Sequence, residues 1–99
     1  MDLGPDTEFR TAWRADIDAL PITDKKTTSY ASAFSNAAHL CGHDVHATVA
    51  LGIAILLKDA PLKKGIRIFF QPAEESSPSG APRLIEQGVL TQVDKVYGM

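Results

Sequence analysis

The chain has 99 residues, of which 44% are hydrophobic and 22% are charged, and its formal net charge is −2. These values predict at most one soluble globular domain with a modest core. The slightly acidic balance excludes the basic footprint of nucleic-acid or anionic-membrane binding, and the longest apolar run, residues 45–57, is too short to span a bilayer.

Cysteine usage and the first residues bear on the cellular location. The single cysteine, Cys41, cannot form an internal disulfide, so nothing indicates an oxidising compartment. Residues 1–8 are polar and acidic, unlike a secretory signal peptide. We therefore expect a cytoplasmic protein with neither nucleic-acid nor membrane partners.

The first predicted element is a strand. Residues 9–15 contain Phe, Thr and Trp, which favour strands, and they lead into Asp16-Ile17-Asp18 before Pro21 ends the element. Carboxylates at i and i+2 point to the same face, so the two aspartates form either a solvated strand end or part of a site. The polar residues 23–35 predict a loop or a short edge strand.

A helix is predicted next, over residues 45–57. Apolar residues recur there at helical spacing and also fill the other faces, so we expect a helix that is buried nearly all round. Asp44 suits its N-cap or first turn, and Pro61 prevents its continuation. The later elements are a strand at 65–71, a flexible loop at 76–80, a short helix at 81–87 and a strand at 93–97.

This order of elements predicts an α/β fold of the three-layer type, with a mostly parallel sheet and right-handed crossover helices. In such sheets, sites form beyond the carboxyl ends of the strands. The Asp16–Asp18 segment and Glu74-Glu75 both follow strand ends, and residues 41–46 directly precede a crossover helix. We therefore expect these three segments to meet in space.

The first polar cluster, residues 39–46, contains all three histidines and the only cysteine. Gly42 lies between Cys41 and His43 and gives the backbone the freedom to aim thiolate and imidazole at one point. Zinc and related divalent ions accept both ligand types. A buried cysteine beside a hydrogen-bonded histidine is the competing interpretation of so short a motif.

The second cluster is Glu74-Glu75. Neighbouring side chains diverge in extended backbone, so we do not expect the two carboxylates to bind one ion in the same way. They can instead divide the work, one holding a metal ion while the other acts as general base on a metal-bound water. An acidic surface loop is the alternative.

Three segments together match one family in order and register: residues 14–22, residues 39–46, and residues 70–75 followed by Gly80-Ala81. Residues 85–90 and 96–99 continue the match, which covers nearly the whole chain. The segments resemble the aminoacylase, hippurate hydrolase and indole-acetyl-amino-acid hydrolase family of dinuclear metallopeptidases.

The resemblance implies a role for each matching residue. Glu74 would be the general base and Asp18 an acidic residue that supports catalysis. The metal ligands would be Cys41, His43 and Glu75, with the cysteine able to bridge two ions. Supporting positions, which orient the ligands or cap the helix, would be His39, Asp44 and His46.

The implied reaction is hydrolysis of the amide bond of a small N-acyl amino acid or peptide-like substrate. Two divalent ions per complete site (manganese, zinc, cobalt or nickel) would polarise the carbonyl and lower the pKa of a bound water. Glu74 would take the proton of that water and pass it to the leaving nitrogen.

Members of this family are several times longer than this chain. They carry a further histidine ligand directly after the segment matching residues 97–99, another near the C-terminus, and a lid domain that mediates dimerisation. We therefore expect residues 1–99 to be a partial catalytic domain that lacks the N-terminal part, the lid and the C-terminal part. The parent would be a homodimer, and the 99 residues alone would not hydrolyse substrate.

Two other classes of protein compete with this hypothesis. A non-catalytic metal-binding module could be built from the same clusters, and a coding sequence that continues past Met99 with histidine would argue against it. A cysteine hydrolase would use Cys41 as nucleophile with His43 or His46. Alkylation rather than chelation would inactivate such an enzyme, and it would leave Glu74-Glu75 unexplained.

Overall fold

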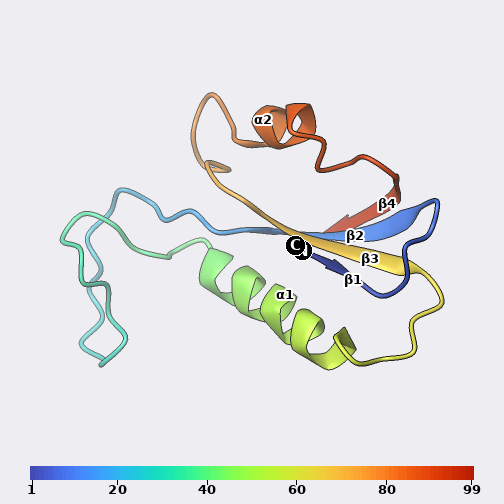
Figure 1. Ribbon diagram of the computed structural model, residues 1–99. Helices are drawn as coiled ribbons and strands as arrows, with labels where there is room; N and C mark the ends of the chain where they lie inside the picture. The colour runs from blue at the N-terminus through green and yellow to red at the C-terminus, as the bar shows by residue number, and fades with distance from the viewer.

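Four strands form one sheet in the computed structural model, which describes residues 1–99. In chain order the elements are β1 (Asp2–Leu3), β2 (Arg10–Asp16), α1 (His43–Leu57), β3 (Gly65–Gln71), α2 (Ala81–Glu86) and β4 (Val93–Gly98). The strand order is β1-β3-β2-β4, with β2 parallel to both neighbours and β1 antiparallel to β3. The predicted α/β fold with a mostly parallel sheet is confirmed (Figure 1).

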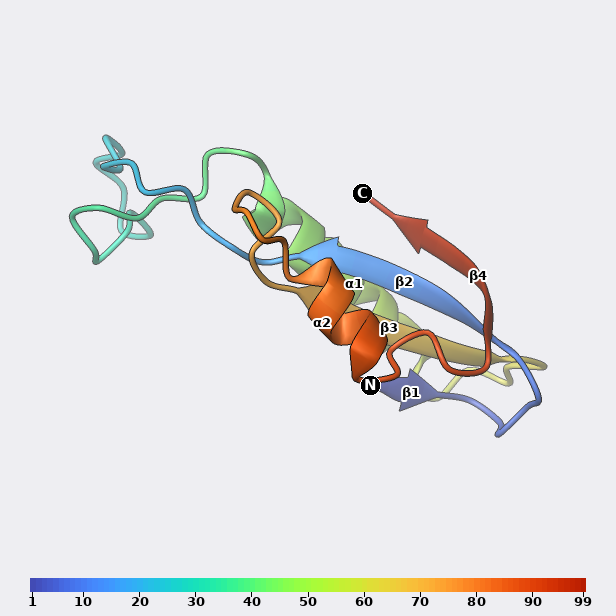
Figure 2. The ribbon, with the colours of Figure 1, turned by 90° about the horizontal axis from the view of Figure 1, so that it is seen from above.

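The two helices lie on opposite faces of the sheet (Figure 1). The connection from β2 to β3 contains α1, and the connection from β3 to β4 contains α2 and crosses the sheet in the opposite direction. Since parallel crossovers are right-handed, opposite directions place the two helices on opposite faces. The loop between β2 and α1 extends away from the sheet (Figure 2).

Contacts between α1 and the sheet form the core. Ala50 and Ala54 of α1 pack with Ala15 of β2 and Ile68 of β3. Three of these four side chains are single methyl groups, so Ile68 supplies most of the buried apolar volume. Only 11 of the 99 residues are buried, and Ile68 is the largest side chain among the fully buried ones. Five partly buried apolar side chains pack against this cluster, and Ile68 is the one large side chain that is fully buried within it; the five are Leu3, Trp13, Ile53, Ile66 and Phe70.

The expectation that residues 45–57 are buried nearly all round is wrong. Helix α1 begins two residues earlier, at His43, and its buried residues are His43, Ala50 and Ala54. The sheet covers only one side of the helix, so the apolar side chains on its other side are exposed. These exposed residues are Val45, Leu51, Ile55 and Leu56.

The other differences from the predicted elements are small. Strand β1 was not expected, because it is two residues long and lies in a polar segment. Residues 23–35 contain no strand, and only an isolated bridge between Leu20 and Ala38 joins the ends of that loop. Neither helix has the length and apolar content needed to cross a membrane.

An ion pair fastens β1 to the sheet and should make stability depend on pH. Asp2 accepts two hydrogen bonds from Arg67, at 2.8 and 2.7 Å. These hydrogen bonds hold the pKa of Asp2 below its ordinary value. A lowered folded-state pKa means that the pair stabilises the fold above the unfolded-state pKa, and that this contribution is lost as pH falls through the folded-state pKa.

We therefore expect Asp2→Asn to lower the free energy of unfolding at neutral pH by about 0.5 kcal/mol, a small value because exposed pairs are screened by solvent. The carboxylate of Asp2 is 41% exposed. The variant should also flatten the acid side of the stability–pH curve measured by urea denaturation. Asp59→Asn, whose partner Lys58 is also exposed, is the matched control and should leave that curve unchanged.

Candidate metal centre

The carboxyl ends of β2 and β3 lie level with each other. Asp16, the last residue of β2, is in register with Gln71, the last residue of β3. The chain then leaves β2 toward α1 on one face and leaves β3 toward α2 on the other face. Such a divergence opens a crevice at the strand ends. Asp18 and Glu74-Glu75, which follow the two strands directly, meet there as the sequence predicted.

Gly42, at the start of α1, has a left-handed backbone conformation that orients its neighbours Cys41 and His43. Gly42 has φ 85° and immediately precedes His43, the first residue of the helix. A residue with a Cβ pays about 1–2 kcal/mol for this conformation. The predicted need for backbone freedom between Cys41 and His43 is therefore confirmed.

His43 lies at the centre of the site with its side chain only 4% exposed. Its Nδ1 is 3.1 Å from Asp18 Oδ1 and 3.1 Å from the Asp18 carbonyl oxygen. Because an ionised carboxylate and a carbonyl oxygen only accept hydrogen bonds, Nδ1 carries the proton. The lone pair of the ring is then on Nε2, which is the nitrogen available to a metal ion.

Asp18 connects the histidine to the glutamate loop. Its Oδ2 accepts a hydrogen bond from the backbone N–H of Glu75 at 3.0 Å. Desolvation alone would raise the pKa of Asp18, but several stabilising contacts, of which the backbone N–H groups of Glu75 and Glu74 come first, together hold that pKa below its ordinary value. The ionised carboxylate therefore fixes both the ring of His43 and the start of the loop.

Both glutamate side chains point toward the same histidine nitrogen. Glu74 Oε2 and Glu75 Oε1 each lie 3.8 Å from His43 Nε2. The expectation that the two side chains diverge is wrong here, because the backbone is not extended. Ala73 has φ 52°, and its carbonyl accepts a hydrogen bond from Gly80 N–H at 3.0 Å, so the chain turns sharply after β3.

Cys41 is exposed, and its thiol lies against Glu75. The hydrogen bond to the Glu75 carboxylate, together with the negative charge of that carboxylate, raises the pKa of Cys41. A nucleophilic cysteine needs the opposite shift, toward the thiolate. The direction of this shift argues against the cysteine hydrolase. The thiol and the Glu75 carboxylate are both potential ligands of one ion.

The donor atoms of Cys41, His43 and Glu75 fit a divalent ion. One ligand atom of each lies within 4.8 Å of the other two. Ligand atoms about 2.1 Å from a tetrahedral ion lie about 3.4 Å from one another. The 3.8 Å between His43 Nε2 and Glu75 Oε1 is close to that spacing. Sulfur, imidazole nitrogen and carboxylate oxygen together suit zinc, cobalt, nickel or manganese.

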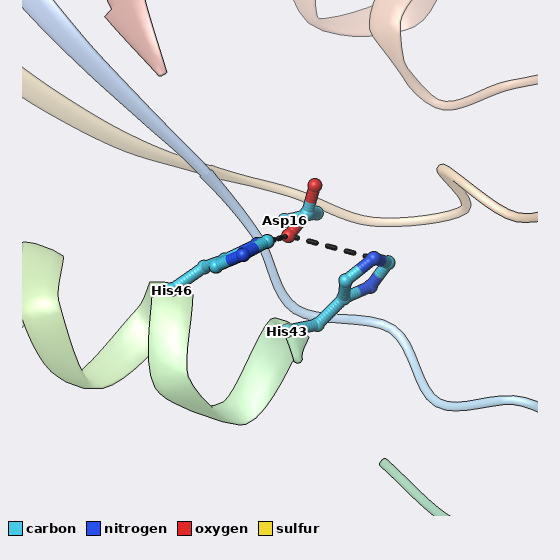
Figure 3. Close-up of side chains that lie close together, drawn as sticks. All are labelled: Asp16, His43 and His46. Carbon is cyan, nitrogen blue, oxygen red and sulfur yellow. Dashed lines mark hydrogen bonds and ion pairs between the residues drawn. The ribbon is translucent and has the colours of Figure 1, made fainter. Parts of the chain in front are cut away.

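A second cluster lies on the buried side of His43; the sequence placed the Asp16–Asp18 segment near the site but gave Asp16 no role there. Asp16 Oδ1 is 2.7 Å from His46 Nδ1 and 3.6 Å from His43 Nε2, as Figure 3 shows. Asp16 Oδ2 forms an ion pair with Arg14 at 2.7 Å. The position of Asp16 two residues before Asp18, on the same strand face, was the sequence signal for it. His46, expected to support the site, does contact it through Asp16.

The remaining two supporting positions contribute less. His39 lies in the loop before α1, and its Nδ1 is buried without a hydrogen-bond partner. Asp44 lies in the first turn of α1 rather than at the N-cap, which is Gly42, and no side chain caps the helix. Neither residue belongs to a group of donor atoms that could hold an ion.

Close packing at Gly80 determines the position of the glutamate loop. A Cβ at this position would lie 2.1 Å from the carbonyl oxygen of Pro72. We expect Gly80→Ala to displace the loop that carries Glu74 and Glu75, to cost about 1–3 kcal/mol of stability, and to weaken Co²⁺ binding about tenfold or more. Urea denaturation and cobalt titration measure the two effects.

Gly52→Ala is the matched control, since a Cβ there meets nothing within 4 Å. In the interior of α1 it should raise stability by about 0.5–1 kcal/mol and leave cobalt affinity unchanged. Equal behaviour of the two variants would contradict the close-packing explanation.

An α/β sheet with sulfur, nitrogen and carboxylate donors converging beyond its strand ends is an arrangement of metal-dependent hydrolases. Residues 12–99 match the family described as peptidase family M20/M25/M40. The chain belongs to this family. The predicted resemblance to metal-dependent N-acyl-amino-acid amidohydrolases is therefore confirmed at the level of the family.

Named relatives include two deacetylases. The chain is 50% identical over 90 residues to N-acetyl-L-cysteine deacetylase of Bacillus subtilis, a match that covers 89% of this chain and 21% of the relative. It is 42% identical over 99 residues to N-acetyldiaminopimelate deacetylase of Lacticaseibacillus casei, covering 97% of this chain and 26% of the relative. A third relative, a Rhodococcus jostii protein named as a glutamate–cysteine ligase, is 40% identical, but the match covers only 12% of its length.

A solved structure is similar throughout. A Bacillus subtilis protein described as a dinuclear metal-binding peptidase of the M20 family superposes with a TM-score of 0.88 at 40% identity, covering 99% of this chain and 28% of that chain. The chain thus spans between 12% and 28% of the length of these four proteins.

Proposed function

We propose that these residues form part of the metal centre of an amidohydrolase that removes the acyl group from N-acyl amino acids. One observation carries the proposal: the donor atoms of Cys41, His43 and Glu75 converge on one point at the strand ends. The names of the two deacetylase relatives support the choice of an N-acyl amino acid as substrate. Because the chain spans a minor part of each relative, we propose the activity for the full-length protein that contains these residues.

The proposed ligands are His43 through Nε2, Glu75 through a carboxylate oxygen and Cys41 through its sulfur. Asp18 would hold the His43 ring by accepting the hydrogen bond of Nδ1. This use of the second ring nitrogen is the usual way in which proteins orient a metal-binding histidine. Asp18 is therefore proposed as a supporting residue, without contact to substrate.

Glu74 is proposed as the general base. Its carboxylate is 40% exposed and reaches the same point as Glu75, yet it is not in the group with Cys41. A divalent ion in this site would polarise the amide carbonyl and lower the pKa of a water molecule. Glu74 would accept the proton of the attacking water and deliver it to the amide nitrogen as the carbon–nitrogen bond breaks. The products would be a carboxylic acid and a free amino acid.

The proposal has further parts. The complete centre would hold two ions, as the description of the similar Bacillus subtilis structure suggests. Residues 1–99 would be one part of a larger catalytic domain and would not hydrolyse substrate alone. The full-length protein would form a homodimer in the cytoplasm. The non-catalytic metal-binding module, the alternative class, would bind the same ions without turnover.

The experiment is to assay the purified full-length protein on N-acetyl-L-cysteine, other N-acetyl amino acids and hippurate. We expect hydrolysis with manganese, zinc, cobalt or nickel, loss of activity after chelation, and recovery when metal is returned. The 99-residue chain loaded with the same metals should show no activity above its Glu74→Gln variant. A full-length protein that binds metal but hydrolyses none of these substrates would support the non-catalytic module.

A further inference from the structure

Two groups of donor atoms overlap at His43. Cys41, His43 and Glu75 form one group, and Asp16, His43 and His46 form the other. His43 Nε2 faces the carboxylates of both groups, since it lies 3.6 Å from Asp16 Oδ1 and 3.8 Å from Glu75 Oε1. An imidazole nitrogen has a single lone pair and binds a single ion. The two groups are therefore alternatives, and something must decide between them.

In the group formed by Asp16, His43 and His46, which we call the buried group, Asp16 and His46 are separated by the distance of a hydrogen bond. Asp16 Oδ1 lies 2.7 Å from His46 Nδ1. Two ligands of one tetrahedral ion would lie about 3.4 Å apart, so this pair leaves no room for an ion between its atoms. Figure 3 shows Asp16 between the two histidines, which both come from the start of α1. For Asp16 and His46 to become ligands, they would have to separate.

Arg14 occupies the other oxygen of the same carboxylate. Its Nη1 lies 2.7 Å from Asp16 Oδ2, and its Nε donates to Gln71 Oε1 at 2.9 Å. The guanidinium is thereby held in place by both strands that end at the site. Its positive charge opposes the approach of a divalent cation, and the low exposure of Asp16, 4% for its side chain, limits screening by water.

We propose that Arg14 and His46 keep the carboxylate of Asp16 engaged, so that it does not bind the ion. His43 Nε2 then binds the ion together with Cys41 and Glu75. Arg14 and His46 are positioning residues that select where the ion binds. The ion then lies on the exposed side of His43, next to Glu74, where a substrate can reach it. This inference rests on the proposed metal centre.

The test uses Co²⁺ and the purified 99-residue chain, with the thiolate-to-cobalt absorption band as the sign that Cys41 is a ligand. The unsubstituted chain should show the band, and Cys41→Ser should abolish it and weaken binding. Adding Arg14→Met to Cys41→Ser should raise the Co²⁺ affinity again, about tenfold or more. The substitution removes the ion pair with Asp16, so that Asp16, His43 and His46 can bind the ion. Adding His46→Leu as well should remove the gain. Circular dichroism checks that each variant folds.

An unsubstituted chain without the band would overturn the proposed centre and the inference together. If the unsubstituted chain shows the band but the Arg14→Met/Cys41→Ser variant does not regain Co²⁺ affinity, the inference alone would be overturned. A second measurement needs no substitution: ring ¹⁵N spectra during Zn²⁺ titration should show a large shift of His43 Nε2 while the Nδ1–H of His46 persists. Loss of that Nδ1–H signal on adding zinc would overturn the inference even if an Arg14 variant does not fold.

Discussion

Glu74→Gln in the full-length protein is expected to lower kcat for N-acyl amino acid hydrolysis by about 10²–10⁴-fold, the usual contribution of a general base. Glutamine keeps the shape of the side chain but does not accept the proton of water at neutral pH. Because Glu74 is proposed to stay outside the set of ligands, the metal content of the purified variant should remain that of the parent. Metal analysis and steady-state kinetics on the same sample measure the two quantities.

Comparing Glu75→Gln with Glu74→Gln separates the role of metal ligand from that of general base. Both carboxylates lie 3.8 Å from His43 Nε2, so distance alone does not separate their roles. Glu75 also contacts the Cys41 thiol, and we therefore expect its variant to lose metal as well as activity. Glu86→Gln on α2 makes the same charge change away from the site and should affect neither. If Glu75→Gln kept its metal and Glu74→Gln lost it, Glu74 would be the ligand and Glu75 the general base.

The largest effect on stability is expected from Ile68→Ala. The side chain is 0% exposed and packs with Ala15, Ala50 and Ala54. Such truncations cost about 2–5 kcal/mol, and the cost falls toward the lower end to the extent that partly buried neighbours such as Leu3, Ile53 and Phe70 move into the cavity. A domain whose total stability is about 5–15 kcal/mol would lose much of it. Urea denaturation of the 99-residue chain, followed by circular dichroism, measures the change.

Ile55→Ala on the outer side of α1 is the control. The same atoms are removed from a side chain that is 59% exposed, and alanine favours helix, so the change should stay within about 0.5 kcal/mol. A large loss of stability in Ile55→Ala would show that the outer side of α1 is covered in solution, for example by a second copy of the chain.

Sequence and structure agree best where the information is local. Strand β3 has the predicted bounds, residues 65–71, because an apolar run between Gly65 and Pro72 admits few alternatives. The strand-end rule correctly placed Asp18 near Glu74-Glu75, since parallel strands that end level bring the following residues together. The burial of α1 was overestimated because apolar spacing indicates which residues can be buried, without saying what covers them.

Taken by itself, the sequence determined the α/β class, the order of every element except the two-residue strand β1, and the two clusters whose side chains have metal-binding chemistry. These follow from backbone periodicity, proline and glycine positions, and side-chain chemistry, all of which are local properties. Only the tertiary structure decided which donors face one another. The Asp16–His46 hydrogen bond spans 30 residues and the Arg14–Gln71 hydrogen bond spans 57.

Contacts of that kind depend on strand register and on the side-chain rotamers that packing selects, and a pattern of residue types specifies neither. For the same reason the sequence grouped His43 with Cys41 by proximity along the chain. The structure added that the same imidazole also lies 3.6 Å from Asp16, whose carboxylate is already engaged by Arg14 and His46.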